Sequence, residues 1–198
     1  MWSGQAPVVA FTVHDKNGNP VALSALGAIQ FTMAGPTTDY GYTSFGTDTS
    51  STPGYVTENP AKATCDGAGN CTYQFAHSVP AKATGTYAIG VEARRTENLL
   101  AGTTKQQRVT YGAPNKVAYF SVDGSVVTPR RTVVAVSNCN QCHVNLSVHG
   151  SLRNNTEYCY VPQPVKYGCF GSCLRTGTIR QERPAARHRL PLAGPSRP

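Results

Sequence analysis

Short apolar and β-branched runs, each ended by Gly, Pro, Asn or Asp, recur through residues 7–111 and restrict this part of the chain to short strands and tight turns. The composition agrees, because Gly (19) and Pro (14) are plentiful while only 14% of residues are charged. About seven strands in about 105 residues is the spacing of a two-sheet sandwich. We therefore predict a mainly β fold, with an immunoglobulin-like, Greek-key β-sandwich over residues 5–112. The runs that predict its strands are 8–13, 28–33, 71–75, 87–92 and 107–111, with weaker ones at 40–45 and 55–57.

Two further apolar runs, residues 117–122 and 131–136, predict strands beyond this sandwich. Residues 144–153 contain no Pro, and we predict a short helix there. The second unit, residues 113–159, is thus a β-rich linker followed by the motif discussed below. The last residues, 160–198, are predicted to form a disordered basic tail.

Cys65 and Cys71 flank a loop of sequence DGAGN between two predicted strands. A loop so rich in turn residues brings its two ends together, so the pair can close a small disulfide across the end of a hairpin. This pairing is expected if the protein is exported to an oxidising compartment. In a cytosol, two free thiols are the alternative.

The sequence C-N-Q-C-H matches C-x-x-C-H, the attachment motif of c-type haem. Two thiols three positions apart reach the two vinyl groups of one porphyrin, and the adjacent imidazole is placed to bind the iron. We therefore predict haem c as the cofactor, held by Cys139 and Cys142 with His143 as the proximal ligand. A zinc site needs a second pair of ligands, which Cys169 and Cys173 can offer, and a redox dithiol or plain disulfide is a third interpretation.

His149 is the candidate for a second axial ligand, because electron-transfer haems often have two histidines. In a helix it would lie about 240° round the axis from His143, which favours the iron of a neighbouring haem over that of its own. The alternative is a solvent-exposed loop histidine. His14 and His77 lie among the predicted strands and are expected at the surface.

Residues 139–159, CNQCHVNLSVHGSLRNNTEYC, resemble the OmcA/MtrC family of outer-membrane multihaem cytochromes, as do the earlier stretches YAIGVEARRTENLLAGTT and VAYFSVDGSVVTPRRTVV. The most specific part of the resemblance is C-x-x-C-H followed by His-Gly. It implies β domains alternating with haem-bearing domains, whose bis-histidine haems pass electrons towards extracellular acceptors such as metal oxides. It also implies that Cys139, Cys142 and His143 hold a haem and that His149 is a distal ligand.

The resemblance ends at Cys159, where the family has a second C-x-x-C-H and this chain continues YVPQP. One permitted codon spelling, TAT-GTG-CCA-CAA-CCC, reads Met-Cys-His-Asn when shifted by one base. The later strings VKYGC and HRLPLAG also become family-like in that frame. We therefore predict that residues 160–198 are a frameshift product and that Cys159 is the remnant of a second haem motif. The alternative is a genuine basic tail.

The net charge of +8 belongs mostly to that tail. Residues 1–159 hold eleven Lys and Arg against nine Asp and Glu, whereas residues 160–198 hold seven against one. Basic tails bind nucleic acid or anionic lipid. Here no aromatic platform or recognised motif accompanies the charge, so we expect no nucleic-acid partner.

The chain contains no run of roughly 18 apolar residues, so no membrane span is expected. Its N-terminus shows no export signal, yet seven Cys and a β-rich composition are typical of exported proteins. We therefore expect a piece of a longer parent that is exported to the periplasm or the cell surface.

The predicted function is electron transfer through covalent haem, as a fragment of an outer-membrane or extracellular multihaem cytochrome. The expected partners are other haems or cytochromes, with metal oxides or soluble extracellular acceptors beyond them, and no enzymatic activity on an organic substrate is expected. The alternative is a secreted immunoglobulin-like binding or structural module whose cysteines are structural.

Overall fold

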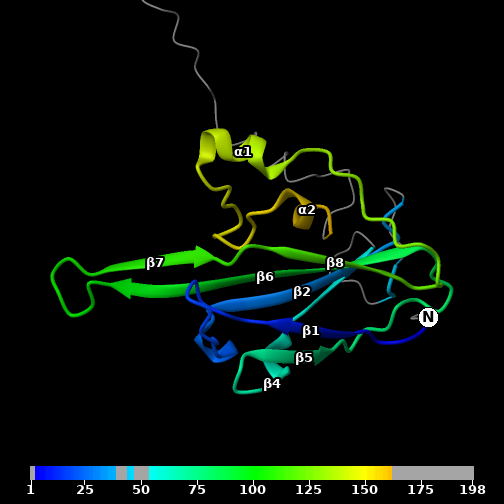
Figure 1. Ribbon diagram of the computed structural model, residues 1–198, viewed down its shortest axis with the longest axis horizontal. Coiled ribbons are helices and arrows are strands. Elements are labelled where there is room, and N and C mark those ends of the chain that lie inside the picture. Colours follow the sequence, from blue (N-terminus) through cyan, green and yellow to red (C-terminus); the bar gives the residue numbers. More distant parts are fainter. Residues whose placement is uncertain (1–2, 39–43, 47–53, 162–198) are drawn as a thin grey trace, which may run out of the picture.

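A computed structural model describes residues 3–38, 44–46 and 54–161 (Figure 1). Most of the predicted tail, Cys169 and Cys173 with it, and most of the weak strand predicted at 40–45 therefore lie outside the described residues. Within them the prediction of a mainly β chain is confirmed, since the strands form two antiparallel sheets.

The larger sheet is built around one long central strand, β6, which pairs with β2 on one side and with both β7 and β8 on the other. The described strands of this sheet are β2 (Ala28–Ala34), β3 (Tyr55–Glu58), β6 (Thr86–Leu99), β7 (Gln107–Gly112) and β8 (Lys116–Ser121). The smaller sheet consists of β1 (Val8–Thr12), β4 (Thr64–Cys65) and β5 (Asn70–Gln74), in the order β1-β5-β4. Two short 3-10 turns, η1 (Leu23–Ala25) and η2 (Pro60–Lys62), connect strands.

The two sheets face each other across an apolar core, which is the packing of a β-sandwich. Phe31 of β2 lies edge-on to Phe11 of β1 at 5.0 Å between ring centroids, and it stacks on Phe75 at 6.1 Å. The buried core residues are Phe31, Met33, Val56, Phe75, Val79, Ala83, Tyr87, Ile89 and Val122. Their alternation along the strands explains why period-two patterns located most of these elements. The immunoglobulin-like Greek key stays a prediction.

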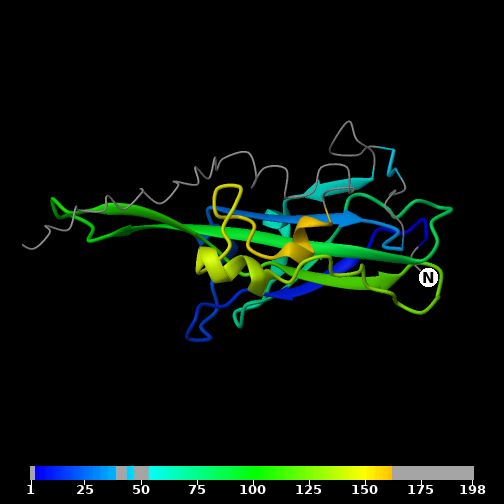
Figure 2. The same cartoon turned by 90° about the horizontal axis from the view of Figure 1, so that it is seen from above.

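The strand β6 is longer than the predicted run 87–92 and continues to Leu99. Its pairing with β2 ends at Arg94, but its pairing with β7 runs on from Arg94 to Leu99. The result is a two-stranded hairpin that projects from the body of the sandwich (Figures 1 and 2).

Among the described residues two helices follow the strands, α1 (Val136–His143) and α2 (Thr156–Cys159), and both lie on the side of the larger sheet opposite the smaller one (Figure 1). The strand predicted over 131–136 is wrong: residues 131–135 join no sheet, and the exposed Val133 has no half-buried face to support one. The helix predicted over 144–153 is also wrong, because Val144, His149 and Ser151 all have positive φ.

The predicted domain boundary at residue 112 falls between β7 and β8, although both strands pair with β6. Moreover, Val161 is buried with Ala34 and Ala88 on the outer face of the larger sheet. Described residues on both sides of the boundary therefore pack as one body.

Candidate haem-attachment site

The helix α1 carries the whole C-x-x-C-H motif in its last two turns. In α-helical geometry, Cys142 and His143 lie on either side of Cys139, and the three side chains occupy an arc of about 100° round the axis. Both thiols and the imidazole therefore project from one face, which is the requirement for one porphyrin to be bound by all three.

This face is open. No residue of α1 is buried, Cys142 and His143 are exposed, and Cys139 is partly exposed. The apolar side chains of Val133 and Val144, on either side of the helix in sequence, are 53% and 83% exposed. A helix without a buried face has little in the protein to stabilise it. These features fit a flat apolar group such as a porphyrin, which would cover the helix and the flanking valines.

The end of α1 is closed by Asn140. Its side-chain oxygen accepts a hydrogen bond from the Leu146 amide at 2.7 Å, and its carbonyl accepts one from Val144 N at 3.1 Å. Leu146 itself is buried. The chain therefore turns back immediately after His143, which keeps the imidazole at the free end of the helix.

The segment after the motif is tied to the sandwich by Asn115, a buried residue between β7 and β8. Asn115 N donates to the side chain of Asn154 at 2.9 Å, and Asn154 N donates to the side chain of Asn115 at 2.7 Å. Asn115 Nδ2 also donates to Leu152 O at 2.8 Å. Because buried amides must be satisfied, this clasp fixes the segment on the sheet.

A buried ion pair reinforces the clasp. Arg153 Nε donates to Glu92 Oε2 of β6 at 3.0 Å, and both side chains are largely buried. Tyr158, fully buried, shares a hydrogen bond with Thr32 at 3.2 Å, and burial, assisted by the charge of Glu92, raises its pKa. Its ring occupies the space left by Gly90, where a Cβ would stand 2.5 Å from Tyr158 Cδ2.

The turn at residues 149–151 docks on the base of the projecting hairpin. Arg94 Nη1 donates to Gly150 O at 3.0 Å. The carbonyl of Ser151 lies where a side chain of Gly112 would be, only 1.8 Å from its ideal Cβ position. The absence of a side chain at Gly112 is therefore a condition for this contact.

His149 lies in this turn, exposed and with φ of 54°. Partial desolvation lowers its pKa, and the positive charge of Arg153 adds to the effect, so the imidazole favours its neutral, metal-binding form. Because the segment is not helical, the expected 240° relation to His143 does not apply. Its role as a distal ligand stays a prediction. Within the described ranges no group of three or more His, Cys, Asp and Glu side chains converges on a metal position.

Cys159 differs from the motif cysteines. It lies in α2, is 2% exposed and is followed by the buried Val161. A porphyrin bound there would require α2 to leave the sheet. The structure thus keeps all three motif residues, Cys139, Cys142 and His143, on the unburied helix α1, whereas Cys159 is buried in α2.

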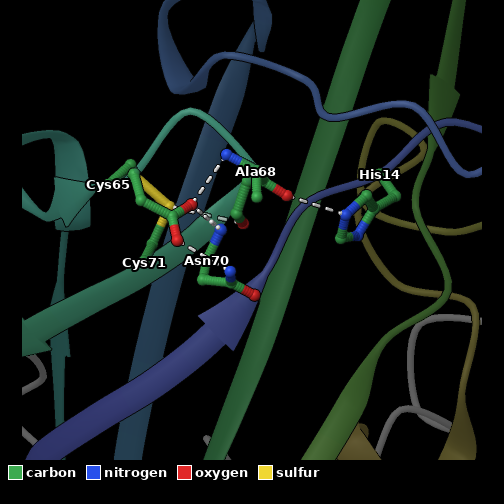
Figure 3. Close-up of a disulfide and its surroundings, with 7 residues drawn as sticks. His14, Cys65, Ala68, Asn70 and Cys71 are labelled. Atoms are coloured by element: carbon green, nitrogen blue, oxygen red, sulfur yellow. Dashed lines mark hydrogen bonds between the residues drawn. A yellow bond between two sulfur atoms is a disulfide. The ribbon is translucent and has the colours of Figure 1, made fainter.

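The sequence singled out two further features, which lie far from α1. A disulfide joins Cys65 to Cys71 across the loop between β4 and β5 (Figure 3). Asp66 orders this loop, because its carboxylate accepts from the amides of Ala68 and Asn70 at 2.9 and 2.8 Å. His14 is exposed, as expected, and hydrogen-bonds Ala68 O at 3.2 Å.

His77, which is expected at the surface, is only partly exposed, because its imidazole pairs with the buried carboxylate of Glu58. Glu58 also accepts from Tyr73 OH at 2.7 Å and from the amides of Ala76 and His77, each at 2.9 Å. Burial alone would raise the pKa of Glu58, but these donors outweigh it and lower the pKa. This cage links β3 of one sheet to the end of β5 in the other. Sequence reasoning misses this cage, because a single Glu in a strand is usually exposed.

Searches against protein-family models and curated proteins found no match to the chain. Among the residues that the structure describes, no helix is long and apolar enough to cross a bilayer.

Proposed function

We propose that the chain binds one haem c through Cys139 and Cys142, with His143 on the iron, and that it transfers electrons through this haem. The observation that carries the proposal is the presence of the complete C-x-x-C-H motif on the open face of an unburied helix. A bound haem supplies reversible one-electron chemistry. The two thiols tether it and the His143 imidazole holds the iron.

The sandwich has the role of a rigid support in this proposal. The Asn115–Asn154 clasp, the Glu92–Arg153 pair and the buried Tyr158 fix the segment that follows the motif. Electron transfer depends on fixed distances between redox centres, so a support of this kind sets where the haem lies relative to its neighbours. We propose other haems or cytochromes as those neighbours, in an exported parent that passes electrons to extracellular acceptors.

The proposal is tested by producing the chain with an added export leader in cells that carry the cytochrome c maturation machinery. We expect the visible absorption of a c-type haem, at one haem per chain, and a haem-stained band that survives denaturing electrophoresis. A Cys139→Ser, Cys142→Ser variant loses both signals. The matched control, Cys65→Ser with Cys71→Ser, keeps them, because the disulfide is remote from α1. A folded, exported chain without haem would refute the proposal and favour a structural or binding module.

We also propose that the reading frame shifts after Cys159. Sequencing the coding DNA tests this directly, and we expect the second haem motif in the neighbouring frame. An uninterrupted frame that encodes relatives of residues 160–198 would refute it.

A further inference from the structure

The hairpin of β6 and β7 extends well beyond the sandwich. Its strands leave the body at the pair Arg94–Gly112 and continue to the pair Leu99–Gln107. At about 3.4 Å per residue, five further residues place the tip roughly 17 Å beyond the last pairing with β2. A two-stranded ribbon without a covered face is marginally stable in water, so its length calls for a partner.

Two exposed leucines open the turn of this hairpin, Leu99 as the last residue of β6 and Leu100 directly after it. Leu99 and Leu100 are 47% and 61% exposed, and Leu100 adopts φ of 52°, the conformation that favours Gly or Asn. Leucine is thus unfavourable here in two ways, through its exposure and through its backbone. Neither is explained by the fold of the isolated chain.

The same hairpin concentrates positive charge. Residues 94–112 hold four Lys and Arg against one Glu, a net of +3, whereas the rest of residues 1–159 holds seven Lys and Arg against eight acids, a net of −1. Arg95 pairs with Glu97 at 3.0 Å. Lys105, in the turn itself, and Arg108, which pairs with Asn98, are both exposed.

We propose that the tip of this hairpin inserts into the interface of an anionic phospholipid bilayer. Leu99 and Leu100 would enter the boundary between headgroups and acyl chains, while Lys105 and Arg108 contact the phosphates. An acidic protein would match the charge, but it gives no reason for two exposed leucines where a projecting turn begins. This inference is independent of the haem proposal and of the basic tail, and it concerns peripheral contact only.

The test uses the full chain with vesicles of phosphatidylcholine alone or mixed with phosphatidylglycerol. A Leu99→Trp variant reports the tip, and Val126→Trp, at a linker position that is 86% exposed, is the matched control. We expect brominated acyl chains to quench Leu99→Trp only in anionic vesicles, while they quench Val126→Trp no more than the wild type, whose single tryptophan is Trp2. Because this readout is local, binding by the tail cannot imitate it. An unquenched Leu99→Trp on vesicles that retain the protein would overturn the proposal.

Charge variants give a second, independent readout. Removing one cation near an anionic surface weakens binding about fivefold. Lys105→Gln and Arg108→Gln are each expected to show this loss, whereas Lys62→Gln, an exposed lysine in η2, is not. An equal effect of all three substitutions would mean that only net charge matters, which contradicts insertion of the tip.

Discussion

Replacing Gly112 by Ala should release the segment that follows the haem motif from the sandwich. The new Cβ would lie 1.8 Å from Ser151 O, and this neighbour is backbone that cannot rotate away. The turn must therefore retreat by about 1 Å or more. This movement breaks two hydrogen bonds, from Arg94 Nη1 to Gly150 O at 3.0 Å and from Asn154 Nδ2 to Ala113 O at 2.7 Å. At about 0.5–1.5 kcal/mol for each hydrogen bond, the free energy of unfolding should fall by about 1–3 kcal/mol.

Urea unfolding followed by circular dichroism measures this change, and hydrogen exchange locates it. We expect faster exchange at the amides of residues 150–155 and unchanged exchange in β2. The matched control is Gly67→Ala, where a Cβ meets nothing within 4 Å and φ is ordinary, so the variant should be neutral or slightly stabilised. Equal stability of the two variants would refute the docking described here.

Three further predictions concern other contacts. Glu58→Gln should lower the free energy of unfolding by about 2 kcal/mol at neutral pH. Because the fold lowers the pKa of Glu58, the stability advantage of the wild type is full above pH 4.5 and disappears as the pH falls through the folded-state pKa. Urea midpoints of the two proteins that differ equally at every pH would contradict this prediction. Asn115→Ala should cost about 2–3 kcal/mol through the unpaired groups it leaves, as thermal unfolding will show, and a cost under half a kcal/mol would disprove the clasp. Cys65→Ser with Cys71→Ser should cost about 2 kcal/mol, as expected for a loop of six residues, and should leave the absorption of the haem unchanged.

Strands were predictable where one face is buried. The run 28–33 alternates because Phe31 and Met33 face the core, and β2 was found almost in full. Beyond Arg94, β6 lies in a hairpin that no second sheet covers, so its sequence carries no alternation and the strand was missed. The run 131–136 has strand propensity but no neighbouring edge, which shows that propensity without pairing does not make a strand.

The motif was predictable because C-x-x-C-H is a local pattern. The contacts that hold the following segment on the sheet were not predictable, because those of Asn115, Glu92 and Gly112 join residues about 40 to 60 positions apart. The sequence predicts a helix over 144–153, whereas the structure has one over Val136–His143, and the reason is similar. Asn140 closes it at His143, and the turn that follows is shaped by the contact of Gly150 with Arg94 rather than by local propensity.

Mass spectrometry of the exported, matured chain tests the central claim most directly. Trypsin should release residues 132–153 as one peptide that contains Cys139 and Cys142. We predict that this peptide carries the added mass of one haem and that neither thiol reacts with an alkylating agent. A peptide of unmodified mass with two reactive thiols, from a chain whose Cys65–Cys71 disulfide has formed, would contradict the account.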